Sequence, residues 1–404
     1  FQFMEIYRMK KSLFAVAALS AVAGVAQAQS SVTIYGILDA GYIGANEKGV
    51  ATSVTNKQQS SLLGQSAEST SRLGFKGSED LGGGASAFFT VEVGLTPTSG
   101  ATTATTMNNR QSFVGLKKNG IGQFAVGTQY TPVFNAASAT DAGQLNNLVG
   151  DVIYATNALT GPANTSGNGP YASTTTATQS GANNDAFTSR TSNTLSFKTD
   201  TFAGFSASGV VIANNQNVTQ TGNTVGGTTN SNGWGLSADY TWNKLYVTAA
   251  YQALKNATPG TATAPTPSIW SSSTGGVNTQ DNQTYVAATY DFGILKAYAQ
   301  WLSRKATDVK DTSYWGKRNA QQIGVRSFVT PTVELFGSVG NGKVTYFGQN
   351  QPSANFTGYQ LGSNYWLSKR TNLYAIFGSA QTSSTSYADG VSSNNYAIGV
   401  RHSF

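Results

Sequence analysis

The residue types that most often do chemistry in enzymes are scarce in this chain. Among its 404 residues there is one histidine, His402, and no cysteine. A catalytic nucleophile needs a positioned base, and many metal sites need imidazole or thiolate ligands. Neither can be assembled here, and no spacing of carboxylates singles out an acid and base pair. We therefore expect no enzyme, no metal and no cofactor.

The charged residues instead follow a period of two. In residues 71–77 (SRLGFKG), Leu73 and Phe75 fall on one side of a strand and Arg72 and Lys76 on the other. If one side faces lipid, the charged side must face water, because a lysine or arginine at the bilayer midplane costs roughly 2–4 kcal/mol. This interpretation turns ten basic side chains inward, against four acidic ones. The basic ones are Arg72, Lys76, Arg110, Arg190, Lys198, Lys296, Arg304, Arg318, Arg326 and Arg401, and the acidic ones are Glu92, Asp239, Asp291 and Glu334.

Alternating segments of about ten residues recur along the chain, the length that a tilted strand needs to cross a bilayer. Their number is even, as expected for a bacterial barrel. The sixteen segments are 32–43, 69–77, 85–95, 108–117, 122–130, 190–199, 204–213, 233–242, 245–254, 282–292, 295–304, 319–328, 333–345, 355–367, 372–381 and 394–404.

Short and long connections alternate between these segments. Turn sequences such as KNGI (118–121) and WNKL (242–245) contrast with Ser-, Thr-, Asn- and Gly-rich stretches such as 214–232 and 255–281. Short turns belong on the periplasmic side of such barrels and long loops outside. The fold expected is all-β: a 16-stranded antiparallel transmembrane β-barrel. A soluble β-sandwich is the alternative, but its strands would hide their apolar faces in one core.

The last segment is the most informative strand. Tyr396, Ile398, Val400, His402 and Phe404 share one face up to the carboxyl terminus. A terminal strand normally frays. An apolar stripe that runs to the end of the chain predicts a closing strand, which must pair with residues 32–43 because lipid cannot satisfy a free strand edge.

Composition and the amino-terminal segment place the chain outside the cytoplasm. Residues 9–28 have the basic, apolar and small-residue parts of a cleaved signal peptide, residues 1–8 are a probable upstream extension, and residues 29–404 are the barrel domain. Charged residues make up 11% of the chain, against about a quarter in soluble domains. The net charge of +7 is spread thinly and forms no basic run, so nucleic acid is not an expected partner.

Several motifs resemble those of the general diffusion porins of Gram-negative outer membranes, in their neisserial and β-proteobacterial subfamily. They are SSVTIYGILDAGY (30–42), SRLGFKGSEDLGGG (71–84), NRQSFVGL (109–116), FAVGTQYTP (124–132), YWLSKRTNLYA (365–375) and GVRHSF (399–404). The resemblance implies a homotrimer of water-filled channels, surrounded by outer-membrane lipid and passing small hydrophilic solutes and ions. With the inward charges above, we expect a mild anion preference.

The resemblance also implies where the constriction lies. The third extracellular loop, 131–189, would fold inward with Asp141 and Asp151 in the lumen, while 161–182 would stay outside. A loop lying wholly outside is the alternative. Wall residues of the lumen would be Arg72, Lys76, Glu92, Arg110 and Arg190. Each arginine could instead merely pair with a neighbour such as Glu92. Phe404 would be the terminal signal read by the outer-membrane assembly machinery.

Other classes of barrel remain alternatives. A channel specific for a sugar or organic anion would line its pore with aromatic residues, and Tyr285 and Tyr298 are inward candidates. An outer-membrane barrel enzyme is disfavoured by the lack of a nucleophile and base. A plugged structural or adhesive barrel would not need a charged interior.

Overall fold

The computed structural model describes residues 31–48, 57–98, 108–155, 186–221, 225–258, 277–309, 312–313, 315–347, 353–383 and 390–404. The predicted signal peptide, the upstream extension and the loop portion 161–182 lie outside these residues. The described strands and helix are β1 (Ser31–Lys48), β2 (Lys57–Gln65), β3 (Arg72–Gly82), β4 (Ala85–Gly94), β5 (Asn108–Lys118), β6 (Gly122–Tyr130), α2 (Pro132–Thr140), β7 (Arg190–Thr199), β8 (Phe205–Ile212), β9 (Asn215–Thr221), β10 (Val225–Trp242), β11 (Leu245–Thr258), β12 (Val277–Asp291), β13 (Lys296–Asp308), β14 (Trp315–Phe328), β15 (Val333–Phe347), β16 (Ala354–Trp366), β17 (Thr371–Thr382) and β18 (Ser392–Ser403).

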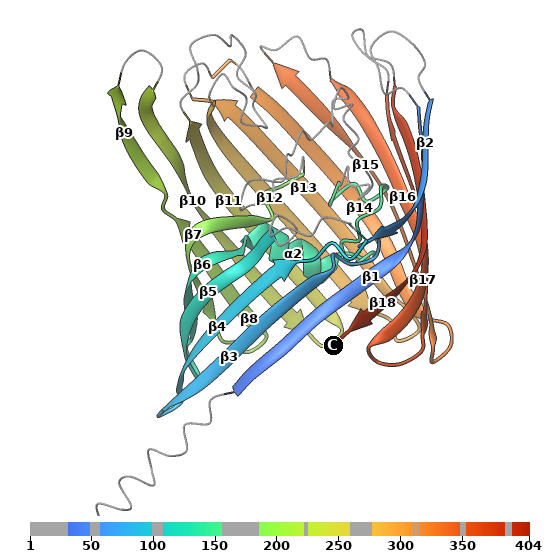
Figure 1. The fold of residues 1–404 in the computed structure, drawn as a ribbon, viewed down its shortest axis with the longest axis horizontal. Helices are drawn as coiled ribbons and strands as arrows, with labels where there is room; N and C mark the ends of the chain where they lie inside the picture. Colours follow the sequence, from blue (N-terminus) through green and yellow to red (C-terminus); the bar gives the residue numbers. More distant parts are fainter. Residues whose placement is uncertain are drawn as a thin grey trace, which may run out of the picture.

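Sixteen of these strands close into one antiparallel ring (Figure 1). The ring runs from β1 through β3–β8 and β10–β18, and β18 returns to pair with β1 from Ile37↔Ser403 to Lys48↔Ser392. The predicted sixteen-stranded barrel is confirmed, and so is the pairing of the last strand with the first. No helix in the described part of the chain is long and apolar enough to cross a membrane.

Two strands were not predicted, and neither adds to the ring. β2 pairs with residues 40–48 of β1, and β3 pairs with residues 31–37 along the same edge of β1. The two strands therefore lie end to end and occupy one position in the ring. β9 likewise lies end to end with β8, and both pair with β10. Both strands consist mainly of Ser, Asn, Gln and Thr, and they lack the apolar alternation from which strands can be recognised.

The outer wall is apolar, as the alternation predicts. Ile323, Val339, Leu361 and Ile398 lie on different strands, and each is more than half exposed. Exposed aromatic side chains gather toward the two ends of the strands, as in the girdles of membrane barrels. Trp242, Phe328, Tyr365 and Phe404 lie near the short turns, and Trp234, Trp301 and Tyr359 lie toward the opposite rim.

The interior contains part of the third loop. Figure 1 shows α2 inside the ring, and α2 contacts β10–β13 most closely. The helix begins at Pro132, and the Thr131 hydroxyl caps it by accepting a hydrogen bond from the Phe134 amide (3.3 Å). Its buried face packs on wall residues such as Leu302 and Tyr285. The described part of the loop therefore lies in the lumen.

The seam between β1 and β18 depends on a glycine. Gly36 and Phe404 exchange two backbone hydrogen bonds, of 3.0 and 3.1 Å. The Phe404 ring covers Gly36, where a Cβ atom would overlap the ring and lie 2.6 Å from the Arg72 carbonyl oxygen. Only glycine fits at this position without displacing the terminal residue.

We predict that Gly36→Val weakens barrel closure by about 1–3 kcal/mol, because the added methyl groups must displace the Phe404 ring or the β3 backbone. The measurement is the temperature at which the purified barrel loses its folded electrophoretic mobility. Gly209→Val is the matched control, since the nearest atom there is the flexible Leu236 Cδ2 at 3.1 Å. An equal drop in this temperature for both variants would contradict the role of the seam.

Candidate pore constriction

Glutamine side chains of the inner wall hold the loop in the lumen. The sheet places them on β11, β12, β13, β14 and β16, facing inward and buried: Gln252, Gln283, Gln300, Gln322 and Gln360. The Gln283 carbonyl accepts from the Thr188 amide (2.8 Å) and the Gln322 carbonyl from the Val152 amide (3.0 Å). Gln360 donates to the Leu148 and Val149 carbonyls (2.9 and 3.1 Å).

An amide side chain suits this position because it both donates and accepts. Loop backbone that leaves water must find partners for its N–H and C=O groups, and each unpaired group costs about 1–3 kcal/mol. Sequence reasoning missed these glutamines because it looked for charge. Their alternation with apolar residues, as in AQWL (299–302) and YQLG (359–362), was the available signal.

The two loop acids also anchor the loop. Asp141 and Asp151 are only 3% and 4% exposed. Asp141 accepts from the Leu145 amide (2.8 Å) and from Gln322 Nε2 (3.1 Å), and Asp151 Oδ1 accepts from the Ile153 and Tyr154 amides (2.7 and 2.9 Å). They lie in the lumen as expected, but neither is open to its water.

Burial changes the charge of this pair. It raises the pKa of the Asp141 carboxyl well above 3.8, and repulsion by Asp151 adds to the shift. Burial also raises the pKa of Asp151. Two adjacent carboxyls in a dry site favour the protonated form. The pair is therefore a weaker source of negative potential than two exposed carboxylates would be.

The predicted wall residues gather on the opposite side of the barrel. Arg72 on β3, Glu92 on β4 and Arg110 on β5 lie on neighbouring strands. Arg110 Nε is 2.6 Å from Glu92 Oε1, and Arg72 Nη1 is 4.0 Å from the same oxygen. Arg110 Nη2 also donates to the Tyr130 hydroxyl (2.7 Å), and the Arg190 guanidinium lies 5.8 Å from the Tyr130 ring centre. Two guanidinium groups thus share one carboxylate, and a third lies beside them against Tyr130.

Lys76 borders this cluster. Its Nζ lies 5.3 Å from the ring centre of Tyr35, whose hydroxyl donates to Glu92 Oε2 (3.1 Å). The structure thus brings together Arg72, Lys76, Glu92, Arg110 and Arg190. It places Asp141 and Asp151 against the wall of β14 and β16, where their hydrogen-bond partners are loop amides and a glutamine.

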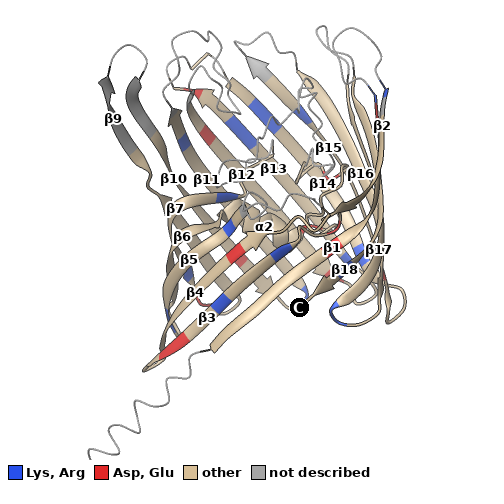
Figure 2. Ribbon diagram, viewed as in Figure 1, with Lys and Arg blue, Asp and Glu red and all other residues tan. Residues whose placement is uncertain are grey.

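The interior holds more acid than the four residues predicted. Additional carboxylates on the inside of the barrel are Asp39, Glu68, Asp281 and Asp308. Glu68, Asp281 and Asp308 sit outside strands, near strand ends or in polar stretches, where alternation gives no face. Asp39, by contrast, lies in the middle of β1 between Leu38 and Ala40, and sequence reasoning missed it. Three predicted inward bases are paired directly: Arg304 with Asp281 (2.6 Å), Arg326 with Glu334 (2.5 Å) and Arg401 with Glu68 (3.6 Å). Figure 2 shows both signs of charge along the ring.

The two tyrosines considered for an aromatic lining are not equivalent. Tyr285 is fully buried beneath the loop, and its hydroxyl lies 2.6 Å from Thr140 Oγ1. It serves as a docking surface for α2. Tyr298 is not beneath α2 in the same way, but it is also buried, with 8% of its surface exposed. Among the described residues no group of three or more His, Cys, Asp and Glu side chains could hold a metal ion.

A sixteen-stranded barrel with an apolar outer wall, a charged interior and a loop docked inside defines a membrane channel. The family model described as Gram-negative porin matches residues 15–385. The chain belongs to this family.

Individual relatives agree with this assignment. The sequence is 28% identical to outer membrane porin protein 32 of Delftia acidovorans, covering 98% of this chain and 100% of that one. It is 34% identical to major outer membrane protein P.IB of Neisseria gonorrhoeae over 36% of this chain and 39% of that protein. Among solved structures, an anion-selective porin from Comamonas acidovorans has a TM-score of 0.67 at 23% identity, covering 93% of this chain and all of that one. The resemblance to the porin family is confirmed, and the relatives place the chain in the outer membrane.

We predict that the loop docks more tightly in acid. The folded-state pKa of Asp151 is raised, so the stabilisation is present at low pH and is lost as pH rises through that pKa. Single-channel current of the wild type should become noisier as the pH rises above about 4. Asp151→Asn, which is neutral throughout, should weaken this pH dependence and leave only the part due to Asp141.

The matched control for this experiment is Asp80→Asn, at the exposed end of β3. Its current should keep the wild-type pH dependence. Identical pH profiles for the wild type and Asp151→Asn would contradict an anchoring role for the pair.

Proposed function

We propose that this barrel is a passive diffusion channel for small hydrophilic solutes and ions, with a mild preference for anions. One observation carries the preference: Arg72 and Arg110 share the single carboxylate of Glu92, and Arg190 lies beside them against Tyr130. One acid neutralises about one of three guanidinium charges. The remainder gives the narrow part of the lumen a positive potential.

The wall on which the loop docks strengthens this preference for anions. Its two loop acids are buried, and their raised pKa values reduce the negative charge that faces the arginines. The lumen at this level thus has a basic side and a nearly neutral side. A transverse field of this kind orients water and charged solutes in a narrow passage. The solved relative from Comamonas acidovorans is an anion-selective porin, and its selectivity has the same sign as the one proposed here.

A channel function also fits the chemistry better than an enzyme. The buried carboxyl pair has no access to a substrate, and His402 is exposed on the outer face, where its ring nitrogen Nδ1 lies 2.9 Å from Thr371 Oγ1. The family resemblance supports a homotrimer, in which each barrel would carry its own pore. A sugar-specific channel would need a continuous aromatic path, and the loop covers Tyr285.

Ion selectivity tests the proposal. Arg110→Gln should lower the ratio of anion to cation permeability about twofold, because unit charges roughly 8 Å apart in water interact by ~0.5 kcal/mol. The measurement is the reversal potential of the channel in a planar bilayer under a salt gradient.

Arg370→Gln is the charge-matched control, since Arg370 lies on an exposed turn outside the lumen. It should leave the reversal potential unchanged. A wild-type channel that prefers cations, or equal shifts in the two variants, would overturn the proposed role of the cluster. Saturable block by a sugar would favour the specific-channel alternative.

We also propose that Phe404 is the signal for assembly into the membrane. Deleting Phe404 should slow insertion by the outer-membrane assembly machinery in reconstituted vesicles. The apolar stripe that the machinery reads would then lack its terminal aromatic residue. Gly36→Val keeps the signal and perturbs only the closed seam, so it should insert and then unfold at lower temperature. Normal insertion of the deleted chain would count against the signal role.

A further inference from the structure

The two ends of the docked loop meet beside the arginines of the constriction. Tyr130 is the last residue of β6, and it pairs in the sheet with Arg190, the first residue of β7. One step beyond this pair, the Thr131 amide donates to the Ser189 carbonyl (3.0 Å) and the Thr131 hydroxyl donates to the Thr188 carbonyl (2.6 Å). These contacts form a neck that holds the entry and the exit of the loop together.

The ring of Tyr130 joins this neck to the helix α2. It stacks on the ring of Phe134, with 4.2 Å between the ring centres and 16° between the ring planes. Phe134 in turn contacts Tyr154 and Phe187, at 6.3 and 6.4 Å between ring centres. Aromatic pairs of this kind stabilise beyond the area that they bury. The position of the Tyr130 ring is therefore fixed relative to the docked loop.

The hydroxyl of the same residue holds Arg110. It accepts from Arg110 Nη2 (2.7 Å), while Arg110 Nε donates to Glu92 Oε1 (2.6 Å). The guanidinium is thus shared between a neutral oxygen at the neck of the loop and a carboxylate on the wall.

Arg326 pairs with its carboxylate differently. Its Nε and Nη2 donate to the two oxygens of Glu334 (2.5 and 2.7 Å), a two-bond geometry that arginine and carboxylate often adopt. Glu92 Oε2 already accepts from the Tyr35 hydroxyl (3.1 Å), but a carboxylate oxygen can accept from two donors. Arg110 would therefore close onto Glu92 in the same way if no hydroxyl held its Nη2.

Tyr130 also touches a second arginine. The Arg190 guanidinium lies 5.8 Å from the Tyr130 ring centre, within the range of a cation–π contact. Arg190 Nη1 is buried and has no hydrogen-bond partner within the described part of the chain. The ring and the hydroxyl of one residue thus contact two of the three arginines at this level of the lumen.

We propose that Tyr130 is a positioning residue for the anion preference, an inference that rests on the function proposed above. Its hydroxyl keeps the Arg110 guanidinium from closing onto Glu92, and its stack on Phe134 ties that guanidinium to the docked loop. Two opposite charges leave a smaller field at a distance when they approach more closely. Because Tyr130 holds Arg110 partly away from Glu92, more of the Arg110 charge acts on ions in the lumen.

A merely structural role for Tyr130 can be separated from this one. Phenylalanine at this position keeps the ring that stacks on Phe134 and contacts Arg190, and it lacks only the oxygen that holds Arg110. The stack should keep the loop docked in Tyr130→Phe. The barrel should also keep its folded electrophoretic mobility.

The reversal potential of the full-length channel in a planar bilayer under a salt gradient tests the proposal. Tyr130→Phe should lower the ratio of anion to cation permeability about 1.5-fold, less than Arg110→Gln does, because the Arg110 charge stays but is cancelled more completely. In a channel that already carries Arg110→Gln, Tyr130→Phe should leave the ratio unchanged. Two substitutions that act through one interaction are not additive.

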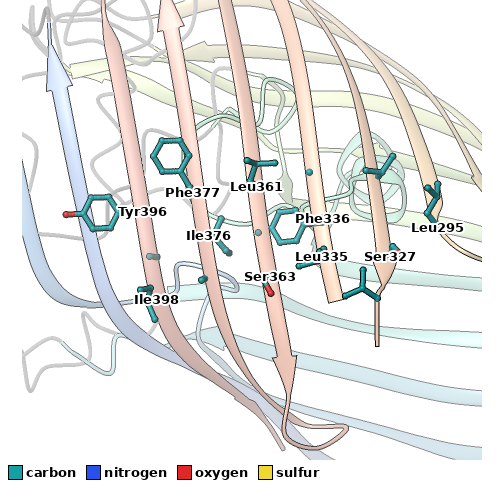
Figure 3. Close-up of a pocket in the computed structure, with 16 residues that line it drawn as sticks. Leu295, Ser327, Leu335, Phe336, Leu361, Ser363, Ile376, Phe377, Tyr396 and Ile398 are labelled. Carbon is teal, nitrogen blue, oxygen red and sulfur yellow. The ribbon is translucent and has the colours of Figure 1, made fainter. Parts of the chain in front are cut away.

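The matched control is Tyr396→Phe, which removes one hydroxyl from the outer wall. The sequence neighbours Asn395 and Ala397 are buried on the inner face, so Tyr396 points outward. It lines an apolar groove of about 700 Å³ (Figure 3). No charged side chain is among the residues that line this groove. Tyr396→Phe should therefore keep the wild-type reversal potential.

Three results would overturn the proposal. They are a wild-type permeability ratio in Tyr130→Phe, an equal drop with and without Arg110→Gln, and loss of the folded mobility in Tyr130→Phe, which would assign the residue a structural role. An equal drop in Tyr396→Phe would also count against it. The proposed function fails separately, if the wild-type channel prefers cations. The dependence of the Tyr130→Phe shift on Arg110 can be measured for either sign of that preference.

Discussion

Backbone hydrogen bonds that lipid cannot replace determine how the rest of this molecule is arranged. An unpaired N–H or C=O group in hydrocarbon costs several kcal/mol, so every membrane-crossing strand needs two neighbours and β18 must reach β1. Closure leaves each strand residue only two environments, lipid or lumen. The stripe ending in Phe404 becomes part of the outer wall, and the chain terminus is held by the Gly36 backbone.

The same requirement organises the interior. A loop that enters the lumen must pair its own backbone, and the wall supplies glutamines that donate and accept. Because these amides lie on β11–β14 and β16, the loop is anchored on that side of the barrel, and Phe134 of α2 reaches Tyr130 of β6, on whose ring it stacks. The arginine cluster lies away from these amides, on β3, β5 and β7. The proposed selectivity therefore follows from where the loop is anchored as much as from which charges the wall carries.

Alternation and turn chemistry were sufficient to predict the ring, because they report directly on the two faces of a strand. They could not reveal β2 or β9, which consist mainly of polar residues and lack apolar alternation. The arginines near Glu92 were predicted by residue type and family resemblance. The burial of Asp141 was not, because a local pattern contains no information on whether Gln322, far away in sequence, removes a loop carboxyl from water. Long-range contacts decide the charge state of such a group.

Net charge is consequently a poor guide to this channel, because equal charges end up in three different settings. Arg326 is cancelled by Glu334, Arg110 shares one carboxylate with another guanidinium group, and Lys317 faces outward. Only the second kind acts on ions in the lumen. A count of ten inward bases against four acids predicts the sign of the selectivity but overstates its strength, since paired groups contribute little field beyond their immediate surroundings. The proposed modest anion preference therefore depends on which charges are paired and which face they occupy, and not on their sum.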